Sequence, residues 1–379
     1  MENNRAIKTL RKAIQKNSDD IKNLKDRLKS KDPRPSIKID NQEISIRKTI
    51  INPKFSNKTV LTDSTWNYVE IFLKDKKEKE ALTYWHQAEN FFKATENLDM
   101  ISKPLTSYYC FLNATKALLT YKKINFDLKH GVSGKRLNGH ILLQNERIKI
   151  QPKGVLSGLC QYFQESINSS GEEYSLKDIF YNIEYIHRAY NLTYKNQAEL
   201  LIPIERIRFV YDKSRKEGWL EANLEPQYSN QSTLKKLTGF SIDRYYDNKD
   251  FYVIRRDKTF QWDAARNTPT TSSLNDFKRY YSNIRQRLRY IYSANKLWYI
   301  KRTDLSSGII DKNPLILTFA AMHRLSELSR YEPNTLDMHL SKSSSWLISE
   351  FISKSIYQFI DIISSEITGD DFRITGFRT

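Results

Sequence analysis

The sequence predicts an α+β protein that is predominantly helical. Apolar residues recur with helical periodicity from Ser64 to Tyr121 and again near the C-terminus, while the region between them shows strand-like alternation. We expect the two helical parts to pack together as one bundle, with a β-rich middle inserted between them. The expected parts are a helix at 1–32, a first part of the helical core at 33–135, a β-containing middle at 136–303 and C-terminal helices at 304–379.

The first predicted element is a helix over residues 1–31 with a heptad repeat. Its apolar residues alternate steps of three and four, with isoleucine dominant at the a positions and leucine at the d positions. This pattern is typical of a parallel coiled coil, so we expect a homo-oligomer formed through residues 1–31. The alternative is that the helix docks on the globular body of its own chain. Asp32-Pro33-Arg34-Pro35 then ends the helix.

The remaining elements follow from periodicity and from turn and cap residues. Residues 36–62 contain short strand-like pieces that we expect to wrap the surface, and at least two helices lie within 64–121. The further predicted elements are a hairpin of residues 141–143 with 148–150, helices at 155–164 and 175–190, strands at 201–211, 219–224 and 251–255, a short helix at 232–238, and C-terminal helices at 315–330 and 344–367.

The composition favours an anionic partner. Among 379 residues, 62 lysines and arginines stand against 44 acidic residues, giving a formal charge of +18. Nucleic acid, an acidic protein or a membrane surface would fit this charge, and so would an ordinary well-solvated basic surface. The two cysteines fit a reducing compartment, and no apolar run approaches the ~20 residues of a membrane helix. We therefore expect a soluble, cytoplasmic protein.

Residues 277–302 have the most distinctive composition in the chain. They hold eight lysines and arginines, seven aromatic residues and no acid. Basic groups interleaved with aromatic rings are typical of surfaces that bind single-stranded nucleic acid, where cations contact phosphates and rings stack on bases. The alternative is an ordinary strand pair whose tyrosines pack inward. The predicted phosphate contacts are Lys278, Arg279, Arg285, Arg287 and Arg289, and the predicted stacking residues are Tyr280, Tyr290 and Trp298.

A second candidate site lies in the segment from Lys103 to Lys135. It opens as a largely apolar helix, with Pro104 in the first turn. A polar stripe follows the helix at steps of three or four residues through Tyr109, Asn113 and Lys116, and the chain then turns to His130. A lysine on a largely buried helix needs partners, because an unpaired buried ammonium is costly. The stripe therefore indicates either a site or a satisfied polar layer in the bundle.

No metal or cofactor site is predicted. The six histidines are scattered, and the chain contains no CxxC, HxxxH or HExxH pattern. The stretch from Gly131 to Arg136 contains GxxGK, but a P-loop has four residues between its glycines and a serine or threonine after the lysine.

Several of these motifs together resemble the bacterial YaaC-like family over roughly residues 60–370. They are Trp85 with Ala88, the run from Lys103 to Ala117, His130-Gly131, and the run from Leu325 to Pro333. The biochemical role of that family is poorly defined, so the resemblance implies a fold more than a function.

The helix YYCFLNATKALL followed by His130-Gly131 also resembles HEPN domains, which are helical bundles that often act as metal-independent ribonucleases in antiviral defence. Their usual motif is an arginine, four to six residues and a histidine, and none of the six histidines here has an arginine at that spacing. By this resemblance, a surviving catalytic site would combine Lys116 and His130, with Asn113 and Tyr109 orienting the phosphate.

Three functions are therefore carried forward. The first is a nucleic-acid-binding component, for RNA or single strands, of a bacterial defence or stress system. The second is a metal-independent ribonuclease that uses Lys116 and His130. The third is a non-catalytic scaffold that assembles partner proteins, with proteins of the same operon as the candidate partners.

Overall fold

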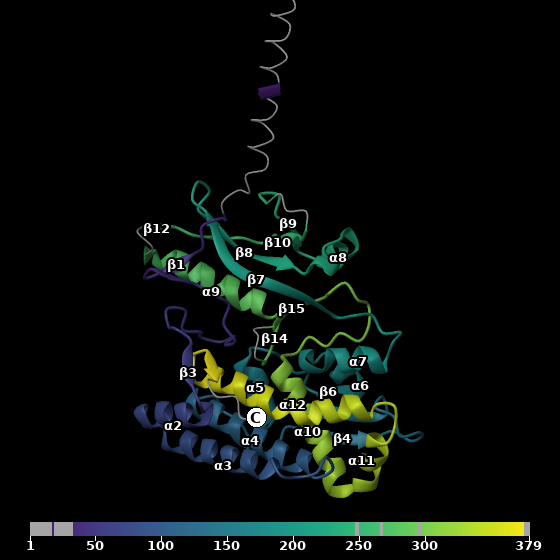
Figure 1. Cartoon of the computed structure of the whole chain (residues 1–379). Coiled ribbons are helices and arrows are strands. Elements are labelled where there is room, and N and C mark those ends of the chain that lie inside the picture. Colours follow the sequence, from purple (N-terminus) through teal and green to yellow (C-terminus); the bar gives the residue numbers. More distant parts are fainter. Residues whose placement is uncertain (1–16, 19–32, 247–249, 266–267, 294–296, 375–379) are drawn as a thin grey trace, which may run out of the picture.

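A computed structural model describes residues 17–18, 33–246, 250–265, 268–293 and 297–374, and these residues form two lobes (Figure 1). The sheet lobe, at the top of Figure 1, comprises residues 33–46 and 201–302. The helical lobe, at the bottom, comprises residues 60–200 and 304–374. Each lobe has its own hydrophobic core. The predicted coiled coil at 1–31 lies almost entirely outside the described residues.

The expectation of a predominantly helical, HEPN-like bundle is wrong. Among the described residues, 44% are helical and 20% lie in strands, and a seven-stranded antiparallel sheet forms a lobe of its own. The strands of the middle region pair with one another and build a separate hydrophobic core, instead of packing on the helical bundle as an insertion. Residues 36–46 do not wrap the surface either, because Ile37, Ile44 and Ile46 are buried in that second core.

The sheet lobe is built on two long central strands, β7 and β8, whose pairing contains a bulge between Glu205 and Arg208. The strand order is β14-β15-β7-β8-β10-β9, and β11 also pairs with β8. The strands are β7 (Leu201–Asp212), β8 (Glu217–Leu224), β9 (Phe240–Ile242), β10 (Val253–Arg256), β11 (Phe260–Gln261), β14 (Leu288–Ile291) and β15 (Leu297–Lys301). The smaller pairs are β1 (Lys38–Ile39) with β2 (Gln42–Glu43), and β12 (Ala264–Ala265) with β13 (Thr268–Pro269).

Helix α9 (Thr271–Arg285) covers one face of this sheet, and α8 (Gln231–Lys236) and the 3-10 turn at Pro226–Tyr228 lie at its edge (Figure 1). The Thr270 side chain caps α9 by accepting a hydrogen bond from the Ser273 amide. Phe277, Tyr281 and Ile284 are buried on the side that faces the sheet. The first half of the 277–302 stretch is therefore a helix, and only its second half forms the strands β14 and β15.

The helical lobe is centred on α4 (Lys103–Tyr121), which packs against α3, α5, α10 and α12. Phe111 of α4 and Phe359 of α12 stack with ring centroids 4.1 Å apart. The other helices are α2 (Thr65–Asp75), α3 (Lys79–Thr95), α5 (Val155–Tyr162), α6 (Leu176–Tyr181), the 3-10 turn Glu184–Ile186, α7 (His187–Thr193), α10 (Pro314–Tyr331), α11 (Pro333–Leu340) and α12 (Ser345–Thr368). None of the helices in the described ranges is both long enough and apolar enough to span a membrane.

A small three-stranded sheet lies against α10 in the helical lobe. Its strands are β4 (Val132–Arg136), β5 (Glu146–Ile150) and β6 (Glu172–Ser175), in that order. The predicted hairpin of residues 141–143 with 148–150 is therefore wrong in its partner, since Ile150 pairs with Val132 and Ile148 with Gly134. The helix predicted at 175–190 is also broken into α6, the 3-10 turn and α7.

The two lobes are joined by the segment that leads from the sheet lobe to β3 (Val60–Thr62), which pairs in parallel with β16 (Phe372–Ile374). The Tyr281 hydroxyl contacts the Arg47 and Thr49 carbonyl oxygens, each at 2.9 Å. The Lys48 ammonium pairs with Asp361 at 2.6 Å, and both groups are buried. Buried polar contacts therefore fix the sheet lobe to α12.

Candidate acid–base centre

The strongest cluster of reactive side chains in the helical lobe lies where α4, α10 and the loop after α4 meet. It consists of Tyr108, Lys116, His130, His323 and Glu327, and we call it the acid–base centre. Helix α4 supplies Tyr108 and Lys116, and α10 supplies His323 and Glu327. Tyr108 is buried, Lys116 is half-buried and His130 is exposed, so the centre runs from the core of the lobe to its surface.

The loop that carries His130 is held in place by the start of α5. The Val155 and Leu156 amides donate hydrogen bonds to the carbonyl oxygens of Lys129 and His130, at 2.8 and 3.1 Å. Gly154 permits this approach, because a Cβ added there would lie 2.5 Å from the backbone of Gly131. The backbone of His130 is therefore anchored although its side chain is exposed.

Tyr108 and His130 form the core of the centre. The Tyr108 hydroxyl is hydrogen-bonded to Nδ1 of His130, and the two rings stack with centroids 5.4 Å apart. His323 packs edge-on against Tyr108 at 4.9 Å, and its ring centroid lies 5.7 Å from that of His130. Because Nδ1 of His130 is engaged, its Nε2 atom is the one left for a substrate.

Both histidines are held in the neutral form. Partial burial, and secondarily the charge of Lys116, lowers the pKa of His130 below its ordinary 6.5. Burial lowers the pKa of His323 to about 3, with smaller contributions from His130 and Arg324. Burial likewise lowers the pKa of Lys116. At neutral pH the centre thus presents a neutral exposed imidazole beside a lysine, a combination suited to proton transfer next to an anion.

A charged network behind the centre positions Glu327. Nδ1 of His323 lies 3.7 Å from the Glu327 carboxylate, which also accepts hydrogen bonds from Arg324 at 3.1 Å and from the Gly134 amide at 3.2 Å. Arg324 in turn pairs with buried Glu146 of β5 at 2.8 Å. Glu327 packs closely on Gly134, because a Cβ at this position would lie 2.0 Å from the Glu327 carboxylate and would displace that side chain.

Glu146 completes this network in the interior. His339 of α11 lies 3.0 Å from Glu146 on the side away from Arg324. Burial alone would raise the pKa of Glu146, but the contacts with His339 and Arg324 outweigh burial and lower it. The carboxylate is therefore charged at neutral pH and ties α10, α11 and β5 together behind the centre.

Of the four catalytic residues predicted from the sequence, Lys116 and His130 are linked by charge, because the Lys116 ammonium contributes to lowering the pKa of His130. That ammonium itself lies over the Tyr84 ring of α3, 5.4 Å from the ring centroid. Asn113 instead donates a hydrogen bond from Nδ2 to the Tyr109 carbonyl oxygen at 2.8 Å, within its own helix. The Tyr109 ring stacks on Phe91 with centroids 5.2 Å apart. Neither contact points to substrate, so orientation of a phosphate by Tyr109 and Asn113 stays a prediction.

Sequence reasoning missed Tyr108, His323 and Glu327. Tyr108 precedes the polar stripe by one residue and is buried, so its position on the helix resembles that of a core residue. His323 lies two residues before the run that begins at Leu325, and Glu327 lies within that run.

Most of the residues at 277–302 that were predicted to contact nucleic acid are buried or half-buried in the structure. The rings of Tyr280, Tyr290 and Trp298 are buried, which leaves them no face on which a base could stack. Arg285 and Arg289 are buried too, and Arg287 is half-buried and bonds the Thr238 carbonyl oxygen at 2.9 Å. Lys278 and Arg279 are exposed on α9. Nucleic-acid binding by the protein stays a prediction, but the stacking roles need another location.

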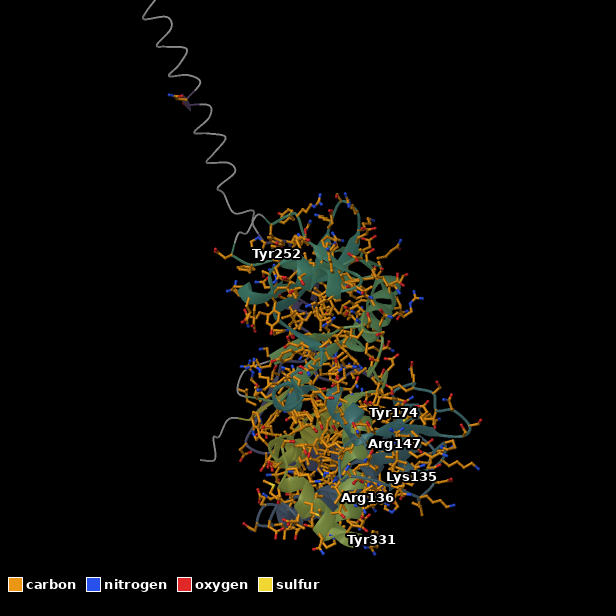
Figure 2. The ribbon with its side chains drawn as sticks, turned by 90° about the vertical axis from the view of Figure 1, so that its right-hand side faces the viewer. Lys135, Arg136, Arg147, Tyr174, Tyr252 and Tyr331 are labelled. Carbon is orange, nitrogen blue, oxygen red and sulfur yellow. The ribbon has the colours of Figure 1, made fainter. Side chains whose placement is uncertain are left out.

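Basic and aromatic side chains that are exposed or half-buried do gather on the helical lobe. Figure 2 shows Tyr174, Arg147, Lys135, Arg136 and Tyr331 along one side of it. Lys135 and Arg136 belong to β4, which begins two residues after His130. Lys135 and Arg147 both pair with Glu173, at 2.9 and 3.1 Å, and Arg136 pairs with Glu332 at 3.1 Å. We call these five residues the β4–β5 basic face.

In the described ranges, no group of three or more histidine, cysteine, aspartate or glutamate side chains is arranged to hold a metal ion. A model of one protein family, described as YaaC-like Protein, matches residues 23–367 of the chain. No curated protein and no solved structure matches the chain, and the expected HEPN-like core is not confirmed.

Proposed function

The chain belongs to the YaaC-like protein family, and we propose that its acid–base centre cleaves RNA without the help of a metal ion. The observation that carries the proposal is the contact of Tyr108 with Nδ1 of His130. It leaves Nε2 of an exposed imidazole at the surface, and the charge of Lys116 contributes to lowering the pKa of that imidazole.

The proposed step is the attack of a ribose 2′-oxygen on the adjacent phosphorus. In the tautomer whose Nδ1–H donates to the Tyr108 oxygen, Nε2 of His130 is unprotonated and accepts the proton of the 2′-hydroxyl while the bond between the 2′-oxygen and phosphorus forms. The bond from phosphorus to the 5′-oxygen breaks, and the Lys116 ammonium donates its proton to that leaving oxygen. The products are a 2′,3′-cyclic phosphate and a 5′-hydroxyl, and proton exchange with water restores both side chains.

Three residues around His130 have separate roles in this proposal. The Lys116 ammonium stabilises the negative charge that builds on the phosphoryl oxygens in the transition state. Tyr108 holds the His130 ring in orientation, as a positioning residue. His323 packs against Tyr108, and its neutral form avoids adding a second positive charge next to His130.

The β4–β5 basic face supports RNA as the substrate. Exposed ion pairs such as Lys135 with Glu173 contribute little to stability, so a phosphate can compete for the lysine. Tyr331, which is 67% exposed, and half-buried Tyr174 lie on the same side of the lobe as these cations (Figure 2). Lys135 and Arg136 belong to β4, which begins two residues after His130.

The second candidate function is nucleic-acid binding without cleavage, and the β4–β5 basic face is the observation that favours it. A cytoplasmic location, partner proteins and a role in bacterial defence or stress are parts of the same proposal.

The test is cleavage of a labelled single-stranded RNA in buffer containing EDTA. We expect the wild-type chain to cleave it and His130→Ala to lose about a hundredfold or more of the rate. His140→Ala is the matched control, because His140 is an exposed histidine outside the centre, and it should cleave like the wild type. Equal cleavage by His130→Ala would contradict the proposal. If the wild type binds RNA in a salt-dependent way but does not cleave it, the ribonuclease proposal is rejected and nucleic-acid binding without cleavage is supported.

A further inference from the structure

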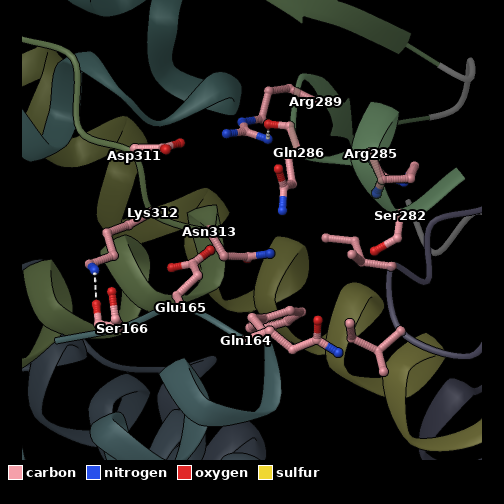
Figure 3. A pocket seen from close by; sticks show the side chains of 13 residues that line it. Gln164, Glu165, Ser166, Ser282, Arg285, Gln286, Arg289, Asp311, Lys312 and Asn313 are labelled. Carbon is pink, nitrogen blue, oxygen red and sulfur yellow. Dashed lines mark hydrogen bonds between the residues drawn. The ribbon is translucent and has the colours of Figure 1, made fainter. Parts of the chain in front are cut away.

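A polar pocket of about 230 Å³ lies between the two lobes, and none of its lining residues belongs to the acid–base centre. Its walls come from the end of α9 and the start of β14 on one side, and from the segments after α5 and before α10 on the other. Figure 3 shows Arg289, Gln286 and Ser282 on one side, and Gln164, Glu165 and Asn313 facing them.

Two buried arginines line the pocket on the sheet-lobe side. Arg285 is 4% exposed and Arg289 is 5% exposed. Arg285 donates to the Leu288 and Lys48 carbonyl oxygens at 2.7 and 2.8 Å, and Arg289 donates to the Gln286 carbonyl oxygen at 2.7 Å. The Nε atoms of both have no hydrogen-bond partner among the described residues. Buried guanidinium groups with unused donors favour an anion at this wall.

The wall on the helical-lobe side carries acidic groups, and only some of its polar atoms have hydrogen-bond partners. Lys312 donates to the Ser166 carbonyl oxygen at 2.6 Å and pairs with Glu172 at 3.1 Å. One carboxylate oxygen of Glu165 is buried without a partner, and burial raises the pKa of Glu165 to about 7. Carboxyl groups of Glu165 and exposed Asp311 can accept hydrogen bonds from hydroxyl donors of a ligand.

A second cavity of about 240 Å³ adjoins this pocket and shares Ile50, Ile51, Gln164 and Ser282 with it. Its remaining walls are Asn52, Pro53, Phe55, Lys278 and Tyr281, so this end of the combined space has apolar walls beside a lysine. Phe55 and Tyr281 are buried, so they close the cavity without offering an open ring face. A ligand that fills both parts needs an anionic head for the arginines, hydroxyl groups for the acids and a flat apolar end.

We propose that the pocket between the lobes binds a nucleoside phosphate, with its phosphate against Arg285 and Arg289 and its base among Ile50, Pro53 and Phe55. The ribose hydroxyls then face Glu165. An alternative is that these buried charged side chains only hold the two lobes together, and this accounts for some of their contacts. It does not account for the polar cavity that these arginines and Glu165 line, or for its continuation into a second cavity.

The test is thermal unfolding of the full chain with AMP, GMP, CMP and UMP at millimolar concentration, compared with adenosine and with inorganic phosphate. At least one nucleotide should raise the melting temperature by about 2 °C or more, and neither adenosine nor phosphate alone should match it. Equilibrium dialysis with the same nucleotide gives the affinity directly.

The variant chosen for this test is Ser282→Glu, because Ser282 is half-buried on α9 at the junction of both cavities. It places a negative charge beside the phosphate and should remove the nucleotide shift, while the control Ser282→Ala keeps it. Arg289→Gln should also remove binding, but its burial makes misfolding a risk. Three results would overturn the proposal: no shift with any nucleotide, an equal shift with phosphate alone, or an unchanged shift in Ser282→Glu. Binding is read without RNA cleavage, so this outcome is independent of the proposed ribonuclease.

Discussion

The Tyr108 hydroxyl is hydrogen-bonded to Nδ1 of His130, although the two residues lie 22 positions apart in the chain. One residue is buried within a helix and the other is exposed in the loop that follows it. The contact fixes which nitrogen of an exposed imidazole stays available, and the predicted chemistry of the acid–base centre depends on that arrangement.

Replacing Tyr108 by phenylalanine removes this contact and keeps the ring packing against Phe319 and His323. We expect RNA cleavage to fall by about tenfold to a hundredfold, the value of one hydrogen bond to a reacting group, with little change in melting temperature. Single-turnover kinetics measures the effect. Tyr357→Phe is the control, because Tyr357 is an exposed tyrosine of α12 whose ring packs on Phe92, outside the acid–base centre. An equal loss in Tyr357→Phe would show that the effect does not come from the contact with His130.

Replacing Lys116 by methionine should raise the pKa of His130. The positive charge of Lys116 disfavours protonation of the imidazole, so its removal makes the histidine easier to protonate. A titration of the histidine ring signals by NMR measures the shift. Lys93→Met on α3, which removes an exposed lysine paired with Glu89, should leave the pKa of His130 unchanged. A pKa that stays constant in Lys116→Met would mean that the two residues do not interact.

The cleavage rate should rise with pH and then fall. His130 acts as a base only when it is deprotonated, so the rate increases as pH rises through the pKa of His130, which lies below the ordinary 6.5. Lys116 acts only when protonated, and burial places its pKa below the ordinary 10.5, so the rate decreases as pH rises through the lysine pKa. A pH–rate profile from pH 4 to 10 tests this. A rate that falls steadily as pH rises from 4 to 8 would be incompatible with a histidine base.

The fold should depend strongly on Glu366 of α12. Its buried carboxylate accepts hydrogen bonds from the Ile50 amide at 2.7 Å, the Ile51 amide at 3.3 Å and the Tyr162 hydroxyl at 2.8 Å. Glu366→Ala leaves these donors unsatisfied, so the free energy of unfolding should drop by roughly 3 kcal/mol or more. Chemical denaturation measures it. Glu350→Ala on the same helix removes only an exposed pair with Lys354 and should change stability by less than about 1 kcal/mol.

The helix that carries Tyr108 could be predicted because its signals are local. Pro104 in the first turn and the apolar spacing specify α4, and the structure begins and ends it at Lys103 and Tyr121. The approach of His323 to Tyr108 could not be predicted, since it depends on how α10 packs on α4, about 200 residues later in the chain. Sequence periodicity marks the buried face of a helix but not its neighbour.

The 277–302 stretch shows why composition alone misleads about exposure. The same arginines and aromatic residues can form a binding surface or a buried joint. Here Arg285 reaches the Lys48 carbonyl oxygen, 237 residues away, and the Tyr280 hydroxyl accepts a hydrogen bond from the Leu220 amide. These hydrogen-bond partners come from distant parts of the chain, so no local sequence pattern predicts them. The wrong balance of helix and strand has the same origin, because strand pairing across the middle region is non-local.

The most direct test of the central claim uses an RNA oligonucleotide that carries one 2′-deoxyribose at a site the wild-type chain cleaves. Single-turnover cleavage in EDTA should disappear at that position alone, and the products from the other positions should end in 2′,3′-cyclic phosphates. Cleavage that continues at the deoxy position would contradict the account, because the attacking 2′-oxygen is missing there and His130 would have no proton to accept.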